Sequence, residues 1–350
     1  MKKSSELRSG WTTGACAAAA AKAAWLGLTG GAFPNSVEIA LPRGERPRFP
    51  LSRSKLREGL ALAGVIKDAG DDPDVTHGAE IIASVRRASP GSGIIFKAGE
   101  GVGRVTRPGL PLAVGEPAIN PGPRFIIAAN LGEIDAEVTI SIPGGEALAA
   151  KTLNARLGIL GGLSILGTTG IVRPFSQSAW IQSIYRAVDV GRASDCHHLA
   201  GVTGRTSETA AKRELGLEET AIIEMGDFVG ALLKYLRRRR VEKLTIVGGF
   251  AKLAKLAAGE LDLHSGKSRV DIGRLAKWAG ECGANSEFLK FAEKANTALG
   301  VLEMAHADGV ALAEAVAVRA RNQALSVLDN GTEIAILVTD RAGRIIGRAG

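Results

Sequence analysis

Between residues 134 and 142 the chain alternates strictly between apolar and polar positions. The apolar positions are Ile134, Ala136, Val138, Ile140 and Ile142. The positions between them are Asp135, Glu137, Thr139 and Ser141. A period of two is typical of a β-strand with one buried and one solvent-exposed face, as in antiparallel sheets. The Pro-Gly-Gly sequence at residues 143–145 predicts a turn that ends the strand.

The rest of the first 150 residues predicts further strands and two helices. Residues 11–28 are rich in alanine, which has the highest helix propensity, and Thr12 or Thr13 can cap this helix. Residues 55–67 predict a second helix, because Leu56, Leu60 and Ala63 share one helical face. Further strands are predicted at residues 36–41, 81–85, 94–98 and 125–129. We therefore expect residues 1–150 to form an α+β domain with a mainly antiparallel sheet.

From about residue 155 onward, short apolar runs alternate with helical patterns. Strands are predicted at residues 162–172, 197–203, 220–225, 244–247 and 333–339. Helices are predicted at residues 176–190, 206–214 and 228–238, with several more before the last strand. This alternation is typical of a parallel sheet covered by helices. The expected fold class is therefore two-domain α/β, in which residues 151–350 form a doubly wound, Rossmann-like domain and the boundary lies near residues 145–158.

The composition narrows the class of ligand. Hydrophobic residues make up 45% of the 350 residues and the net charge is +8, so the chain is globular and basic. Aromatic residues are only 4% and no aromatic RNA-binding motif is present, which favours a polyanionic small molecule over nucleic acid. Cys16, Cys196 and Cys282 are far apart, so we expect neither a disulfide framework nor a protein-bound metal.

The sequence also bears on location. Residues 1–10 are polar and lack an apolar signal core. No stretch approaches the roughly 20 charge-free apolar residues of a membrane span. We therefore expect a cytoplasmic protein that does not bind membranes. The alanine-rich faces make a homo-oligomer possible.

Residues 67–78 (KDAGDDPDVTHG) contain four aspartates and a histidine within ten positions. Three interpretations stay open. The segment could bind a divalent cation, although its spacing does not match the calcium-loop pattern. The segment could also supply a general base with a raised pKa. It could also be a solvated turn, since Asp, Gly and Pro are typical turn residues.

Glycine-rich turns follow several predicted strands. Residues 99–103 could cradle an anion on backbone N–H groups, but the lysine and serine or threonine of a P-loop are missing. Arg107 and Arg124 lie downstream and can pair with carboxylates. Thr168 and Thr169 belong to a second turn, at residues 166–170.

A third turn, at residues 200–208, joins a predicted strand to a predicted helix through Gly201 and Gly204. Twenty residues after Gly204, Glu224 ends the next predicted strand. This order is how many folds hold a nucleoside, with the acid on the ribose hydroxyls. Asp227 could do the same work. The signal is weak, because the full GxGxxG motif is absent.

A fourth turn precedes a helix that carries Lys252 and Lys255, three positions apart on one face. With His264, Lys267 and Arg269, these lysines would form a basic pocket for carboxylates. The alternative is a helix with two solvated lysines.

Taken together, these segments resemble the CbiD family of cobalt-precorrin-5B C1-methyltransferases. The matching blocks are residues 10–24, 67–78, 99–110, 115–124, 151–174, 203–208, 225–230 and 248–268. The sequences DDPDVTHG and LGTTGIV are the most specific. The chain departs from the pattern at Trp11 and Ala15, where Phe and Thr are expected, and it lacks a second glycine at position 202 or 203.

The resemblance implies methyl transfer from S-adenosylmethionine to C1 of a polycarboxylated cobalt-corrinoid intermediate, giving cobalt-precorrin-6A in cobalamin biosynthesis. The implied donor site comprises Gly201, Gly204, Arg205 and Thr206, with Glu224 or Asp227 on the ribose, or else Thr168 and Thr169. The implied cations for the substrate carboxylates are Arg104, Arg124, Lys252, Lys255, His264 and Lys267. Asp72, Asp74 and His77 are the candidate acid or base.

Two other functions remain open at this point. The first is a non-catalytic corrinoid carrier, which would bind the macrocycle without a donor site. The second is a phosphoryl-transfer enzyme, suggested by the turn at residues 99–103.

Overall fold

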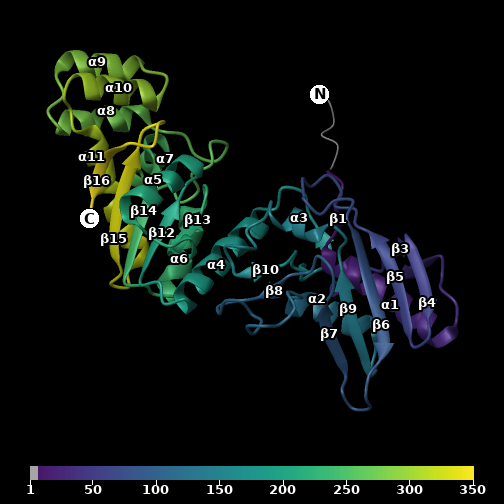
Figure 1. Ribbon diagram of the computed structural model, residues 1–350. Helices are drawn as coiled ribbons and strands as arrows, with labels where there is room; N and C mark the ends of the chain where they lie inside the picture. The colour runs from purple at the N-terminus through teal and green to yellow at the C-terminus, as the bar shows by residue number, and fades with distance from the viewer. Residues whose placement is uncertain (1–6) are drawn as a thin grey trace, which may run out of the picture. The chain divides into compact units, whose positions relative to one another are not determined.

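The computed structural model describes residues 7–350, so the first six residues of the polar N-terminal segment lie outside the described part. The chain divides into two compact units, Met1–Gln177 and Ser178–Gly350, and the fold is mixed α/β (Figure 1). Within residues 7–350, no helix is both long and apolar enough to cross a membrane.

The first unit is built on a five-stranded sheet. Its strand order is β4 (Arg53–Arg57), β5 (Leu60–Ile66), β6 (Glu80–Arg87), β9 (Ala136–Ser141) and β7 (Ile94–Ala98). Neighbouring strands are antiparallel except β7 and β9, which are parallel. The strand predicted from strict alternation is confirmed as β9, and its apolar positions are the buried ones.

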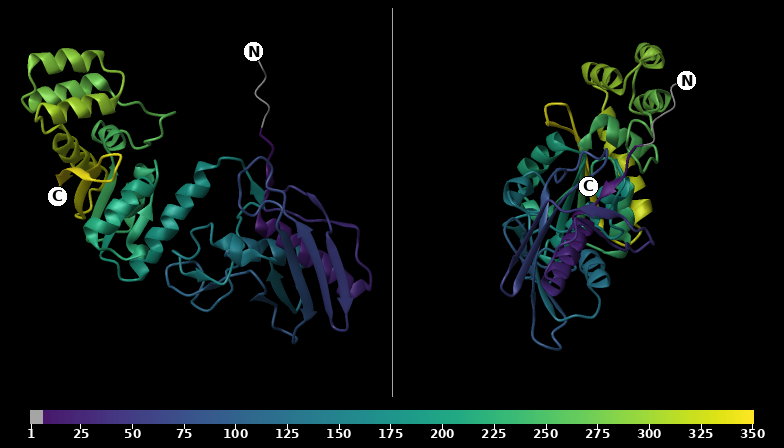
Figure 2. Two further views of the ribbon diagram at one scale, coloured as in Figure 1. Left: turned by 45° about the horizontal axis from the view of Figure 1, so that its top comes forward. Right: turned by 90° about the vertical axis from the view of Figure 1, so that its right-hand side faces the viewer.

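Helix α1 (Thr13–Gly30) packs against β5, β6 and helix α2 (Pro121–Leu131) (Figure 2). Thr12 caps α1, because its hydroxyl accepts a hydrogen bond from the backbone N–H of Ala15 at 3.2 Å. The buried alanines of α1 are so small that the helix can lie close to the sheet. Short elements complete the unit: β1 (Gly10–Trp11), β2 (Ser36–Glu38), β3 (Arg48–Pro50), β8 (Arg104–Val105), α3 (Gly145–Ala149), β10 (Ile159–Leu160) and β11 (Ile171–Val172).

Three predicted elements of the first unit are wrong. Residues 55–67 form the β4–β5 hairpin instead of a helix, and Gly59 supplies the positive φ of +69° that the turn requires. Residues 125–129 belong to helix α2, whose first turn contains prolines, a position that suits proline. The predicted strand at 162–172 is a glycine-rich loop that reaches strand geometry only at β11.

The second unit also contains a five-stranded sheet, in the order β13 (Ile222–Glu224), β12 (His198–Val202), β14 (Lys243–Gly249), β15 (Glu333–Thr339) and β16 (Ile345–Ala349). The first four strands are parallel and β16 is antiparallel. The predicted strands at 197–203, 220–225, 244–247 and 333–339 are confirmed. The predicted helices are confirmed as α4 (Gln177–Ala193), α5 (Arg205–Leu215) and α6 (Val229–Arg238).

Helices cover both faces of this sheet. A large apolar cluster joins one face to α4, α6, α7 (Phe250–Ala257) and α11 (Leu312–Leu328), and a smaller cluster joins the other face to α5. Three further helices are α8 (Ile272–Glu281), α9 (Ser286–Lys294) and α10 (Ala298–Ala307), and a 3-10 turn spans Glu219–Ala221.

The strand order places a change of direction between β12 and β14. From β12 the chain moves outward to β13, then returns to the other side of β12 to form β14. The connections after β12 and β14 therefore diverge, which leaves a crevice at the carboxyl ends of these strands. In open α/β sheets this crevice is the usual place for a ligand.

The packing of α1 gives a first prediction. Ala18 is fully buried, so Ala18→Leu forces a larger side chain into filled space and lowers the free energy of unfolding by about 1–3 kcal/mol. Chemical denaturation measures the change. The exposed Ala307 in α10 supplies the matched control, Ala307→Leu, which we expect to be nearly neutral. Equal stability of the two variants would contradict the described packing.

Candidate functional site

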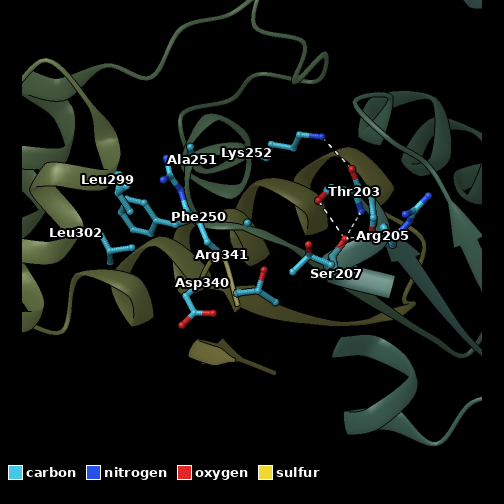
Figure 3. A pocket seen from close by; sticks show the side chains of 14 residues that line it. Thr203, Arg205, Ser207, Phe250, Ala251, Lys252, Leu299, Leu302, Asp340 and Arg341 are labelled. Carbon is cyan, nitrogen blue, oxygen red and sulfur yellow. Dashed lines mark hydrogen bonds between the residues drawn. The ribbon is translucent and has the colours of Figure 1, made fainter. Parts of the chain in front are cut away.

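A pocket of about 390 Å³ lies at the carboxyl ends of β12, β14 and β15 in the second unit (Figure 3). Four stretches line it: residues 203–207 after β12, residues 249–252 after β14, residues 339–341 at the end of β15, and Leu299 and Leu302 of α10. The pocket therefore occupies the crevice that the strand order creates.

Two helices begin at the pocket. Helix α5 starts after Gly204, and helix α7 starts after Gly249. Neither start has a side-chain cap. The first N–H groups of a helix have no partner within it and carry a partial positive charge, so both starts can receive an anionic group.

The turn between β12 and α5 is held by Ser207. Its hydroxyl accepts a hydrogen bond from the backbone N–H of Thr203 at 3.0 Å and donates one to the carbonyl of Gly204 at 2.7 Å. Gly204 has a φ of +155°, a conformation that side chains rarely adopt. The turn is thus fixed before any ligand arrives.

Lys252 connects three loops at this edge. Its ammonium donates to the carbonyl of Thr203 at 2.9 Å and lies 3.0 Å from Oδ1 of Asp227 (Figure 3 draws the bond to Thr203). The contact with Asp227 is an ion pair. Oδ1 of Asp227 is buried and has no hydrogen-bond partner. The loops after β12, β13 and β14 are therefore joined by one cation.

Glu224 is the other acid at the end of β13. It pairs in register with Val202, the residue before Thr203, so it lies one strand from the pocket. Across residues 7–350, no side chain forms a hydrogen bond or an ion pair with the half-buried carboxylate of Glu224. Gly201 is buried within β12, where a Cβ would lie 2.6 Å from Leu232, so its role is close packing.

The pocket has a polar side and an apolar side. The polar side carries Arg205, Lys252 and Arg341 together with Asp340. Burial raises the pKa of Asp340, but hydrogen bonds from the backbone and the guanidinium of Arg344 outweigh it, so the net pKa is below its ordinary value. The apolar side is formed by Phe250, whose ring points toward Leu299 and Leu302 in Figure 3.

The other predicted cations of this unit do not line the pocket. Lys255 is only 7% exposed, and its ammonium donates to the carbonyl of Leu263 at 2.8 Å. This arrangement gives Lys255 a structural role and corrects the prediction that it binds a substrate carboxylate. His264 and Lys267 are exposed on the loop that follows, where Nδ1 of His264 accepts a hydrogen bond from the N–H of Gly266.

The predicted cations of the first unit differ in availability. Arg124 donates to the carbonyl of Ile119 at 2.8 Å and to Glu116 at 3.2 Å, and its guanidinium stacks over Phe96. These contacts occupy most of its donors. Arg104 is exposed, and its one described bond is a long one of 3.3 Å to the carbonyl of Gly115.

A buried lysine stabilises the aspartate-rich loop of the first unit. Lys67 is 1% exposed, and its ammonium donates to Oδ2 of Asp74 at 2.8 Å. The other oxygen of Asp74 accepts hydrogen bonds from the N–H and the hydroxyl of Thr76. Burial raises the pKa of Asp74, but Lys67 and Thr76 outweigh it and the net pKa is lowered. Asp74 therefore does not have the raised pKa that a general base of this loop was expected to have.

The remaining acids of the loop fasten neighbouring segments. Asp72 accepts a hydrogen bond from the N–H of Phe175 at 2.9 Å. Hydrogen bonds from Arg8 lower the pKa of Asp68 to about 2. His77 is 54% exposed and its Nδ1 accepts from the N–H of Ala69 at 3.1 Å, which leaves Nε2 to carry the proton of the neutral ring. Within the described residues, no three metal-binding side chains come together.

Thr168 and Thr169 lie in the loop at residues 166–170, against the start of α1. The carbonyl of Leu166 accepts from the N–H of Gly14 at 2.9 Å, so this helix start is already occupied by the chain itself. The hydroxyl of Thr169 bonds to the backbone of Ile171. The starts of α5 and α7 are more open than the start of α1.

The structure thus gathers Gly204, Arg205, Thr206 and Lys252 around one pocket, with Glu224 and Asp227 beside it. Sequence reasoning missed Leu299, Leu302, Asp340 and Arg341. Asp340 and Arg341 follow the last predicted strand, so the rule that ligands bind at the carboxyl ends of parallel strands could have found them.

Two family models match the chain: CbiD over residues 1–174, and the CbiD C-terminal domain over residues 262–350. The chain is 55% identical over 352 residues to a protein of Paramagnetospirillum magneticum and 56% identical over 348 residues to one of Rhodospirillum rubrum. Both relatives are named cobalt-precorrin-5B C(1)-methyltransferase, and each alignment covers 98% of both chains. A crystal structure of the cobalamin biosynthesis protein cbiD of Archaeoglobus fulgidus is 31% identical, with a TM-score of 0.41 over 75% of this chain and 83% of that one.

The buried ion pair of the first unit gives a second prediction. Lys67→Met keeps the length of the side chain but leaves the Asp74 carboxylate without its cation. We expect the free energy of unfolding at neutral pH to fall by about 1–3 kcal/mol. Urea denaturation measures it, and Lys151→Met, at an exposed lysine, is the control.

The same pair has a defined pH dependence. The pKa of Asp74 is lowered in the folded protein. The ion pair therefore contributes fully to the free energy of unfolding above the ordinary pKa of aspartate, about 4. This contribution is lost as the pH falls through the pKa that Asp74 has in the folded protein. The difference between the wild type and Lys67→Met should therefore narrow below about pH 4. If the difference in free energy of unfolding between the wild type and Lys67→Met stays constant on acidification, the ion pair is not its cause.

Proposed function

The chain belongs to the CbiD family, and we propose that it transfers a methyl group from S-adenosylmethionine to C1 of cobalt-precorrin-5B, giving cobalt-precorrin-6A in cobalamin biosynthesis. The activity follows the names of relatives that align over nearly the whole chain. A methyltransferase needs a methyl donor, and S-adenosylmethionine is the donor that the family resemblance implies. A cytoplasmic location fits three cysteines that form no disulfide.

The observation that carries the donor site is the pocket at the carboxyl ends of β12, β14 and β15. We regard the second unit as Rossmann-like, and in such folds this edge binds nucleosides. The carboxylate of the methionine moiety suits the starts of α5 and α7 beside Arg205 and Arg341. Asp340, whose pKa is lowered, stays ionised at neutral pH and offsets the positive charge that a sulfonium would meet.

Glu224 is the better acid for the ribose hydroxyls. Asp227 is paired with Lys252, and using it for the ribose would break that ion pair. Glu224 has no such partner among the described side chains and ends the strand next to Thr203. A carboxylate at this place accepts hydrogen bonds from ribose hydroxyls.

In this reaction the protein does not need to form a covalent bond with either substrate. The bond from sulfur to the methyl carbon breaks, a bond from that carbon to C1 forms, and S-adenosylhomocysteine leaves. Such a displacement depends on alignment and on exclusion of water. The bonds of Ser207 and Lys252 fix the loops around the pocket in advance, which is the contribution that alignment requires.

Arg104, His264 and Lys267 stay candidates for binding substrate carboxylates, because each of these residues is exposed. His77, with an exposed ring whose Nε2 is not used by the loop, is the better candidate for moving a proton than Asp74.

Titration calorimetry with S-adenosylhomocysteine tests the donor site. We expect the wild type to bind, and Glu224→Gln to weaken binding by about tenfold or more, because it removes charged hydrogen bonds. Glu218→Gln, at an exposed glutamate before the amino end of β13, is the matched control and should bind normally. Thr168→Val should also bind normally.

Two outcomes would contradict this assignment. If Glu224→Gln binds as well as the wild type while Thr168→Val does not, the donor lies in the first unit. If the wild type binds cobalt-corrinoid but no S-adenosylhomocysteine under any condition, the chain is a corrinoid carrier.

A further inference from the structure

An exposed tryptophan lies next to the proposed ribose site and has no part in the function described so far. Trp180, in helix α4, is 45% exposed. A Cβ placed on Gly226 would lie 3.5 Å from Nε1 and Cζ2 of its indole, which is ordinary van der Waals distance. The indole therefore lies beside the turn after β13, about one methyl group away from Gly226, and keeps much of its surface open.

This turn is fixed relative to the donor pocket. The N–H groups of Met225 and Gly226 both donate to the carbonyl of Val202, at 3.0 and 3.2 Å. Val202 is also the register partner of Glu224 and precedes Thr203, which lines the pocket. Gly226 has a φ of +57°, a left-handed conformation that glycine adopts without strain. Trp180 and Glu224 therefore both lie beside the turn after β13, which is bonded to the strand that leads into the pocket.

A nucleoside held at Glu224 has its two ends separated along the edge. The methionine moiety extends toward the pocket, where the helix starts and cations lie. The base is attached at the opposite side of the ribose, so it extends over β13, the outermost strand. At this end the described surface offers the turn at Gly226 and the indole of Trp180.

The chemistry of the two rings matches. Adenine is a flat aromatic heterocycle, and aromatic side chains bind bases by stacking, with an indole giving the largest contact area. A tryptophan left exposed costs free energy that a stacked base would recover.

We propose that Trp180 is the adenine platform of the donor site: the base of S-adenosylmethionine stacks on the open face of the indole while Glu224 binds the ribose. The proposal rests on the donor site described above. It adds a residue that favours a ligand with a base over anionic ligands that lack one.

The test measures binding of S-adenosylhomocysteine to the full chain by calorimetry and by tryptophan fluorescence. We expect Trp180→Leu to weaken binding by about tenfold or more and Trp180→Phe, which keeps a ring, to weaken it less. The ligand should quench the fluorescence of the wild type, and Trp180→Phe should lose that quenching while still binding. Trp25→Leu, at a partly buried tryptophan of the first unit, is the control and should retain both the affinity and the quenching.

The outcomes separate this inference from the proposed function. If Glu224→Gln loses the ligand but Trp180→Leu binds as tightly as the wild type, the donor site stands and the adenine platform is wrong. If Trp180→Phe keeps the full ligand-dependent quenching, stacking on Trp180 is also excluded. If the wild type does not bind S-adenosylhomocysteine, the donor site fails and the platform fails with it.

Discussion

The ammonium group of Lys252 joins the loops at the edge of the second unit where the pocket lies. It contacts the carbonyl of Thr203 and the carboxylate of Asp227 from the first turn of α7, and thereby joins the loops that follow β12, β13 and β14. Without this cation, the buried Oδ1 of Asp227 would lose its counter-ion. The loops after β12, β13 and β14 would also lose the contact that they share. Because Asp227 is used in this way, the neighbouring Glu224 is the acid left available for a ligand.

Charged side chains also hold a loop of the first unit in place. Residues far apart in the sequence meet around the aspartate-rich loop, where Arg8 binds Asp68 and Asp71, Lys67 binds Asp74, and Asp72 holds the backbone of Phe175. Most of these carboxylates are thus structural. These contacts fix the loop at residues 67–78, while the ring of His77 stays 54% exposed.

Much of the fold could be predicted from the sequence, because local patterns were unambiguous where one face of an element is buried. The alternation around Val138 and the buried strands of the second unit are such cases. A helix was wrongly predicted for residues 55–67, because the spacing of Leu56, Leu60 and Ala63 fits a helix as well as a hairpin. The turn at Gly59 decides between the two structures. Residues 125–129 misled because an apolar run fits both a strand and a buried helix.

The candidate site was predictable only in part. Gly204, Arg205 and Thr206 could be found because a strand, a glycine turn and a helix follow one another in the sequence. The burial of Lys255 and the approach of Leu299 and Leu302 depend on tertiary packing, which no local pattern encodes. The same holds for the ion pair between Lys252 and Asp227, on which the preference for Glu224 rests.

The most direct test of the proposed activity is a single-turnover reaction of the purified protein with cobalt-precorrin-5B and methyl-labelled S-adenosylmethionine. We expect the label to appear in the corrinoid at C1, with an equal amount of S-adenosylhomocysteine formed. A corrinoid that binds but remains unlabelled, with the donor unconsumed, would contradict it.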